Sequence, residues 1–196
     1  MTEPKTVRTR LYRYGMLALV MAIYLGVSIT LASTQADTLI DLIGSDNAYL
    51  LMFVLGIIGG LTTFTGVPYH LVLMSLAAGG LSPVLLGICT AMGVMIGDST
   101  MFLIGRNVKA ALSDRVMATV DHLTSFLTKR PRMVTPALVA YGAVSPFSND
   151  FIVASLSIMG YSFWRTVIPL AIGNTFYNIA FAYFGLYAYD AILEFF

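Results

Sequence analysis

Long apolar segments alternate with short polar segments along this chain. The first apolar segment covers residues 14–33 and follows a polar, basic segment at residues 1–13. A helix needs about 20 apolar residues to cross a bilayer, so residues 14–33 predict a transmembrane helix. The apolar core of a cleaved signal peptide is shorter, about 7–15 residues. We therefore interpret residues 14–33 as an uncleaved membrane anchor.

Two later apolar segments contain helix breaks. Gly66 and Pro68 interrupt one of them, and Ser145 and Pro146 interrupt the other. Proline lacks an amide hydrogen and disfavours the helical conformation at the residue before it. The apolar arm after Pro68 has about 10 residues, which is about 15 Å of helix or half of a bilayer. Each break therefore predicts a re-entrant hairpin, which enters the membrane and returns to the same side.

The two broken segments belong to a repeated unit. Residues 48–106 form the first copy, and residues 134–190 form the second. The copies share residues at matching positions, which include Pro68 and Pro146, Ser75 and Ser155, Gly80 and Gly160, and Ser82 and Ser162. Asp98 in the first copy corresponds to Asn174 in the second. Duplicated broken hairpins are typical of membrane transporters.

Residues 107–133, between the two copies, have a different pattern. Apolar residues recur there at intervals of three and four, with charged residues between them: Val108, Leu112, Val116, Val120, Leu123 and Leu127. This spacing places the apolar residues on one side of a helix. We expect an amphipathic helix that lies at the membrane surface or covers the bundle.

The composition supports a membrane location. The chain is 58% hydrophobic and 11% charged, with a mean hydropathy of +0.82, whereas about a quarter of the residues of a soluble protein are charged. The sequence therefore predicts an all-α integral membrane protein with a single membrane domain. Its predicted elements are three transmembrane helices (14–33, 83–105 and 166–189), two re-entrant helical hairpins and one interfacial amphipathic helix.

The basic residues predict the orientation. All 11 Lys and Arg residues lie within residues 5–13, within residues 106–132, or at Arg165. Basic residues concentrate on the cytoplasmic side of membrane proteins. This rule is satisfied when the two hairpins enter from opposite faces as an inverted repeat, with the N-terminus in the cytoplasm and the C-terminus outside. We expect the chain in the inner (plasma) membrane of a bacterium.

The helix breaks also predict a binding site. In each hairpin the helix after the break begins near the middle of the membrane, and the N-terminus of a helix carries partial positive charge. Two such ends that approach from opposite faces suit an anionic group, such as a phosphate or a carboxylate. The alternative is that the breaks only allow tight packing.

Five polar residues are candidate substrate-binding residues: His70, Asp98, Asn149, Asp150 and Asn174. His70 could bind an anion or carry a proton, or it could be a neutral histidine bonded to the backbone. Asp150 could handle a proton or a cation, or it could cap a helix. Asp98 lies within a span, where ionisable residues normally face a cavity or a partner, although an interfacial position is the alternative. Asn174 is expected to bond between helices.

The sequence shows no site of the kind that soluble enzymes use. It has no Cys and His cluster for a metal, no glycine loop for phosphate and no pairing of a nucleophile with a base. We therefore expect no enzyme activity, no catalytic residues, no metal, no cofactor and no nucleic-acid partner.

Several short motifs occur together in residues 45–187. They are Val67-Pro68 before LVLMSLAAGGL, Gly97-Asp98 followed by Gly105-Arg106, and Pro146 in YGAVSPFSNDF followed by Ser155-Leu156 and Met159-Gly160. With these motifs the chain resembles the DedA/VTT family of membrane proteins, which includes the eukaryotic SNARE-associated Golgi-type members. The resemblance implies two opposed re-entrant hairpins. It also implies movement of a phospholipid or a polyprenyl-phosphate carrier between leaflets, linked to protons.

The chain differs from the family pattern in its charges. Family members usually carry acidic residues in the first hairpin, where this chain has threonines and His70. They also carry two arginines around the second break, where this chain has Ala143 and Asn149. One hypothesis is that His70 and Asp150 replace the charged pair with reversed placement.

Two functions are compatible with these observations. The first is a flippase-like membrane transporter that moves a lipid or a small anionic substrate through a site at the two hairpin tips. Its partners would be membrane lipids, together with a lipid phosphate or a small anion. The second is a non-transporting membrane subunit, which packs into a larger membrane complex or a homo-oligomer.

Overall fold

The protein, seen in a computed structural model, is built from helices. The structure describes residues 40–41, 44–61, 69–108, 113–129, 131–145 and 148–193, and no β-strand occurs among them. The predicted anchor at residues 14–33 lies outside this part of the chain, as do Gly66, Pro68 and Pro146. The predicted all-helical fold class is confirmed for the part that is described.

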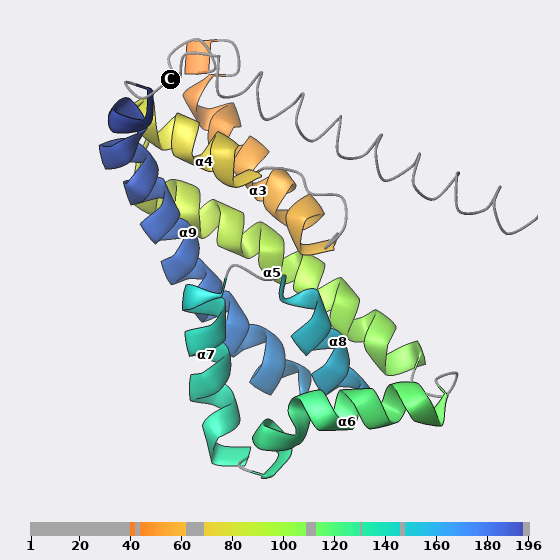
Figure 1. The fold of residues 1–196 in the computed structure, drawn as a ribbon. Coiled ribbons are helices and arrows are strands. Elements are labelled where there is room, and N and C mark those ends of the chain that lie inside the picture. Colours follow the sequence, from red (N-terminus) through yellow and green to blue (C-terminus); the bar gives the residue numbers. More distant parts are fainter. Residues whose placement is uncertain are drawn as a thin grey trace, which may run out of the picture.

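Each predicted repeat contains two short helices and one long helix (Figure 1). In the first repeat these are α3 (Ser45–Leu61), α4 (Tyr69–Ala78) and α5 (Pro83–Val108). In the second they are α7 (Val134–Val144), α8 (Asp150–Ile158) and α9 (Phe163–Leu193). The connection between the repeats contains α6 (Asp114–Lys129) and a 3-10 turn, η2 (Pro131–Met133).

Two of these helices are long and apolar enough to cross a membrane. They are α5 and the part of α9 at Phe163–Tyr187. Both occur where the sequence predicts transmembrane helices. The amphipathic helix predicted between the repeats is present as α6, where Val120 is buried and its neighbour Asp121 is exposed.

The predicted break of the second hairpin is confirmed at Ser145, and helices flank the predicted break of the first, whose Gly66 and Pro68 lie outside the described residues. The first helix of one hairpin ends at Leu61 and its second begins at Tyr69, while α7 ends at Val144 and α8 begins at Asp150. Ser145 is extended (φ −75°, ψ 124°), as expected for a residue before proline. Figure 1 shows that α4 and α8 both begin in the middle of the molecule and run toward opposite ends.

The same turn follows the second helix of each hairpin. Gly80 (φ +89°) and Gly160 (φ +85°) take up the left-handed conformation that glycine adopts without strain. The amide of the next residue donates to the Leu76 carbonyl (3.2 Å) in the first repeat, and to the Leu156 carbonyl (3.0 Å) in the second. This is the Schellman pattern of a helix end, and it directs the chain into α5 and α9.

The two repeats interlock. The first helix of each hairpin packs on the long helix of its own repeat, α3 on α5 and α7 on α9. The second helix crosses over, so that α4 packs on α9 and α8 packs on α5. The long helices α5 and α9 also pack on each other. Each hairpin is therefore held by both repeats.

Glycine allows the close contacts within each repeat. A Cβ atom added at Gly60 of α3 would lie 2.6 Å from the Val94 carbonyl oxygen of α5. A Cβ atom added at Gly142 of α7 would lie 2.8 Å from the Leu170 carbonyl oxygen of α9. Small residues are the usual means by which membrane helices approach closely, and both repeats use them at the matching helix pair.

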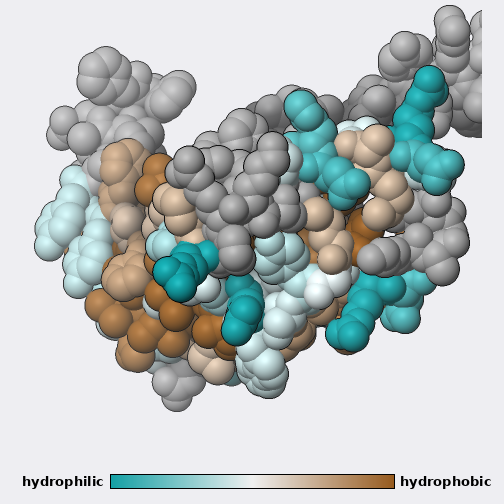
Figure 2. All heavy atoms as spheres, turned by 90° about the horizontal axis from the view of Figure 1, so that it is seen from below, coloured by the Kyte–Doolittle hydropathy of each residue, from teal (hydrophilic) through white to brown (hydrophobic). Residues whose placement is uncertain are grey.

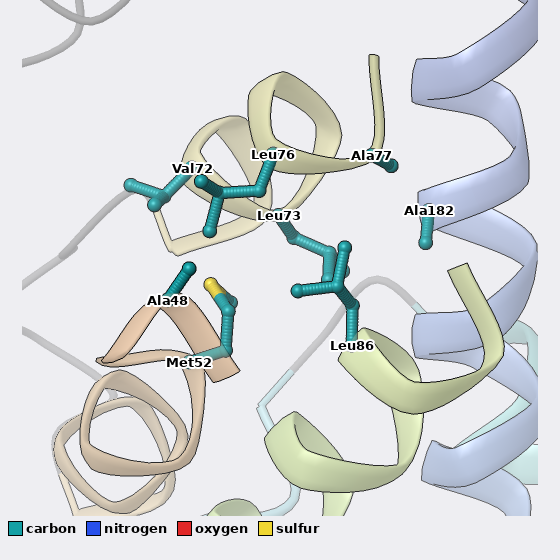
Figure 3. Close-up of a cluster of buried hydrophobic side chains, with 8 residues drawn as sticks. All are labelled: Ala48, Met52, Val72, Leu73, Leu76, Ala77, Leu86 and Ala182. Carbon is teal, nitrogen blue, oxygen red and sulfur yellow. The ribbon is translucent and has the colours of Figure 1, made fainter. Parts of the chain in front are cut away.

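Two apolar cores stabilise this arrangement. The first, drawn in Figure 3, joins α3, α4, α5 and α9 through Ala48, Met52, Val72, Leu73, Leu76, Ala77, Leu86 and Ala182. The second joins α5, α7, α8 and α9 through Phe102, Val134, Leu138, Val153, Leu156, Val167 and Leu170. Each core is built mainly by one repeat and includes one residue of the other, Ala182 in the first core and Phe102 in the second.

The exposed arginines gather at one end of the molecule. Arg106, Arg115, Arg132 and Arg165 are all exposed, and they lie on the elements at the lower end of Figure 1. Figure 2 views this end, and most of its strongly hydrophilic residues lie in the right half while hydrophobic residues prevail on the left. The predicted orientation would place this end in the cytoplasm.

Candidate functional site

The tips of both hairpins reach one residue of α5, Asp98. From the α8 side, the Asn149 amide nitrogen donates to Asp98 Oδ2 at 3.0 Å. From the α4 side, Tyr69 lies within range of an electrostatic interaction with Asp98. The side chain of Asp98 is 1% exposed. Asp98 therefore bonds to the residue at the start of α8 and interacts electrostatically with the first residue of α4.

A second buried carboxyl lies beside Asp98. Asp150, the first residue of α8, is 5% exposed and interacts electrostatically with Asp98. Residues 48–106 hold no acidic residue besides Asp98, and residues 134–189 hold none besides Asp150. Folding therefore brings together the single acidic residue of each of these two segments. Two buried carboxylates repel each other, so the pair favours a positively charged neighbour.

Asn149 reaches Asp98 because other residues hold the turn before α8. Asn149 occupies the N-cap position of α8, but its side chain makes no capping bond. The Asp150 amide donates to Ser148 Oγ instead (3.3 Å), and the Tyr141 hydroxyl donates to the Ser148 carbonyl (3.1 Å). These two bonds fix the turn, and the Asn149 side chain extends toward α5.

His70, the second residue of α4, lies among aromatic rings. Its ring centroid is 3.9 Å from that of Tyr69, 5.6 Å from that of Tyr177 and 5.1 Å from that of Phe181. Within the described part of the chain, the buried His70 Nε2 atom has no hydrogen-bond partner. His70 therefore makes no hydrogen bond to the described backbone through Nε2, contrary to the alternative of a backbone-bonded histidine at that atom.

Two amides are also buried in α9. Asn174 is 7% exposed and Asn178 is 1% exposed, and the Asn178 Nδ2 atom donates to the Asn174 carbonyl at 2.8 Å. Besides His70 Nε2, the buried atoms without a partner among the residues described here include Asp98 Oδ1, Asn174 Nδ2 and Asn178 Oδ1. Buried polar groups are normally paired, so these atoms are candidates for ligand contacts.

The structure brings some of the predicted site residues together directly and others through intermediates. Asp98, Asn149 and Asp150 form one group. His70 is connected to this group through Tyr69. Asn174 is buried in α9, where its backbone carbonyl accepts from Asn178 Nδ2, and its own Nδ2 atom has no partner among the described residues. Among the predicted hairpin breaks, Ser145 is the one that falls within the described residues.

Sequence reasoning missed Tyr69 and Tyr177, which contact His70, and Asn178, which donates to the Asn174 carbonyl. Tyr177 and Asn178 follow Asn174 by three and four positions, which places them on the same side of α9. That spacing is the sequence signal that could have identified both residues. Tyr69 adjoins His70, and its position at the start of α4 could have drawn attention to it.

Metal binding by acidic, cysteine and histidine side chains has no visible basis in the described segments. No group of three or more such residues lies close enough there to hold an ion. Asp98 and Asp150 form a pair, and a ligand would need further contacts from the amides or aromatic residues nearby.

Comparison with known proteins assigns no family. Scans against protein-family models, curated proteins and solved structures give no match. The resemblance to the DedA/VTT family therefore rests on the motifs in the sequence.

Proposed function

We propose that this protein is a membrane transporter, which moves a lipid or a small anionic substrate through the site around Asp98. One observation carries the proposal. The single acidic residues of the segments 48–106 and 134–189, Asp98 and Asp150, are both buried and interact electrostatically where two hairpins from opposite ends of the molecule approach each other.

The cost of this arrangement supports a binding role. An aspartate near the centre of a membrane costs about 3 kcal/mol on insertion scales. Asp98 and Asp150 are both almost fully buried, and Oδ1 of Asp98 is unpaired within the described chain. Apolar residues would pack the same helices without this cost. Selection for a bound ligand explains the carboxyls better than packing does.

The interlocked hairpins support alternating access to the site. Because α4 packs on α9 and α8 packs on α5, a shift of either hairpin relative to the long helices would change the contacts at Asp98. The two hairpins run toward opposite ends, so each is suited to expose the site to one side. Inverted repeats in transporters work in this way.

The helix N-termini at the site support an anionic group in the substrate. Both α4 and α8 begin at the cluster, and their first amides carry partial positive charge. Residues 14–105, 133–164 and 166–196 contain no Lys or Arg, so amides would hold a phosphate in this site. The resemblance to the DedA/VTT family supports the same class of substrate.

Transport can be tested with the purified protein in liposomes. The vesicles would contain phospholipids labelled with a fluorophore on the acyl chain, and dithionite would quench the label in the outer leaflet. We expect faster exchange between leaflets than in protein-free vesicles, and at least a tenfold lower rate for Asp98→Asn. Asp121→Asn, the same change at an exposed position on α6, is the matched control and should leave the rate unchanged.

Equal rates in protein-containing and protein-free vesicles would contradict transport of lipids. Native mass spectrometry of the same sample would then examine the alternative of a non-transporting subunit. An exposed aromatic face on α9, with Phe176, Phe184 and Tyr187 more than half exposed, is the surface on which a larger complex could form.

A further inference from the structure

The chemistry around Asp98 points to a more specific ligand. We propose that the site binds an ammonium group, either that of a small amine or that of a lipid headgroup. This inference rests on the proposed transport function for its biological meaning, but the binding site itself can be tested separately.

The charge of the site favours a cation. Asp98 and Asp150 interact with each other, and the sequence places no Lys or Arg in either hairpin. Asp98 Oδ2 accepts one hydrogen bond from Asn149, which carries no charge. The other oxygen, Oδ1, is buried and lacks a partner in the described part of the protein. An ammonium group can donate to such an oxygen and neutralise the carboxylate.

A group of aromatic rings around His70, linked to Asp98 through Tyr69, favours an ammonium group over an inorganic ion. Tyr69 interacts electrostatically with both Asp98 and Tyr177. The rings of Tyr177 and Phe181 lie 4.7 Å apart, centroid to centroid, and both contact His70. Aromatic faces next to a carboxylate are the usual means of recognising organic ammonium ions, through cation–π contacts.

The ammonium group is compatible with an anionic group in the same substrate. The zwitterionic headgroup of a phospholipid carries a phosphate and an ammonium group on neighbouring atoms. The N-terminal amides of α4 and α8 would face the phosphate, while Asp98 and the tyrosines would face the ammonium group. A free amine would use the second set of contacts alone.

Binding can be measured without transport. We would record the thermal unfolding midpoint of the full chain in detergent with ethylammonium chloride, and with sodium chloride at the same concentration. A ligand that binds the folded state raises the midpoint. We expect ethylammonium to raise it for the wild type and for Asp121→Asn, and to leave Asp98→Asn unchanged. Equal effects of sodium and ethylammonium on the wild type would overturn the inference.

A second pair of variants covers the case in which Asp98→Asn does not fold. Tyr177→Phe keeps the ring, and Tyr177→Leu removes it. We expect ethylammonium to bind Tyr177→Phe within about twofold of the wild type. Loss of the ring should weaken binding by about 5- to 30-fold, because a desolvated cation–π contact contributes that range. Equal affinity of the two variants would overturn the inference.

Transport experiments then distinguish the two sources of the ammonium group. Liposomes with acyl-labelled phosphatidylethanolamine or phosphatidylglycerol would test the lipid, and uptake of radiolabelled ethanolamine would test the small amine. At least tenfold faster movement of phosphatidylethanolamine than of phosphatidylglycerol supports the lipid source. Ethanolamine uptake without movement of either lipid supports the small amine. Equal movement of the two lipids would keep the transport function and overturn the ammonium site.

Discussion

The two repeats of this protein share a scaffold and differ in their chemistry. Both have a broken hairpin, a turn with a left-handed glycine and a long helix that a glycine pair brings close to its neighbour. The polar residues do not match. Asp98 on α5 corresponds to Asn174 on α9, and the aromatic start of α4 corresponds to the Ser148, Asn149 and Asp150 sequence at the start of α8.

This difference separates what the fold needs from what the site needs. The interlocking of α4 on α9 and of α8 on α5 requires both repeats to have the same shape, so the turn and glycine positions are duplicated. A binding site for one ligand at the meeting point of two repeats need not be symmetric. The residues that differ between the repeats are therefore the ones that we expect to determine ligand and rate.

The largest effect is expected from the shared scaffold. A Cβ atom at Gly97 would lie 2.6 Å from the Cα of Gly60, and one at Gly173 would lie 2.8 Å from the amide of Ala143. Backbone cannot move aside as a side chain can. Gly97→Leu and Gly173→Leu should each lower the free energy of unfolding by about 3 kcal/mol or more, measured by thermal or denaturant unfolding in detergent.

Gly160→Ala is the control for this pair. A Cβ atom there meets no atom within 4 Å, but the residue has φ +85°, and the left-handed conformation costs an alanine about 1 kcal/mol. A smaller loss for either leucine variant than for this alanine would contradict the close approach of the helices.

Exchanging the polar residues of the two long helices tests the asymmetry. The double variant Asp98→Asn with Asn174→Asp moves the carboxyl from α5 to α9 and keeps the composition. We expect at least a tenfold loss of lipid movement in liposomes, as for Asp98→Asn alone, because Asn149 contacts position 98. Wild-type rates of lipid movement in the exchanged variant would show that the carboxyl works equally well on α5 and α9, and would contradict the asymmetry of the site.

Sequence patterns predicted the features of the repeats that depend on local chemistry. Proline placed the end of α7 next to Ser145, and glycine placed the turns at Gly80 and Gly160. The pattern also predicted Asp98 as an ionisable residue within a span, which the structure shows to be buried in α5. Each of these depends on a residue type and its immediate neighbours.

The contacts between repeats could not be predicted in this way. Tyr69 and Tyr177 both contact His70 because α4 crosses to α9 of the other repeat. Asn149 was a candidate because of its place at a helix start, but its bond to Asp98 depends on the packing of α8 on α5. Apolar periodicity identifies a helix face without identifying the helix that covers it.

The Asn149 side chain makes a polar contact with a carboxyl between the second hairpin and α5. Asn149→Ala removes its bond to a buried carboxylate, and such bonds contribute about 1.5–3 kcal/mol. The free energy of unfolding should fall by about 2 kcal/mol in a denaturant titration. Asn107→Ala is the matched control, because that amide is exposed and donates to Leu103 of its own helix. Equal losses for the two variants would contradict the proposed role of Asn149.

The smallest effect is expected from a neutral contact between the same helices. The Ser157 hydroxyl of α8 donates to the Phe102 carbonyl of α5 in a buried position. Ser157→Ala should destabilise the protein by about 1 kcal/mol. Ser99→Ala removes a hydroxyl that bonds within α5 and should cost less. A larger loss of stability for Ser99→Ala than for Ser157→Ala would contradict a stabilising contact of Ser157 between α8 and α5.

The meeting of both hairpin tips at Asp98 can be measured directly by crosslinking in native membranes. Cysteine pairs at positions 98 and 149, and at positions 98 and 69, would be introduced with Cys89→Ala and treated with a short bifunctional thiol reagent. We predict that both pairs crosslink, while a pair at positions 149 and 103 does not, because Leu103 is an exposed residue of α5. Crosslinking of one tip without the other, or of the control pair equally, would contradict a single site shared by the two hairpins.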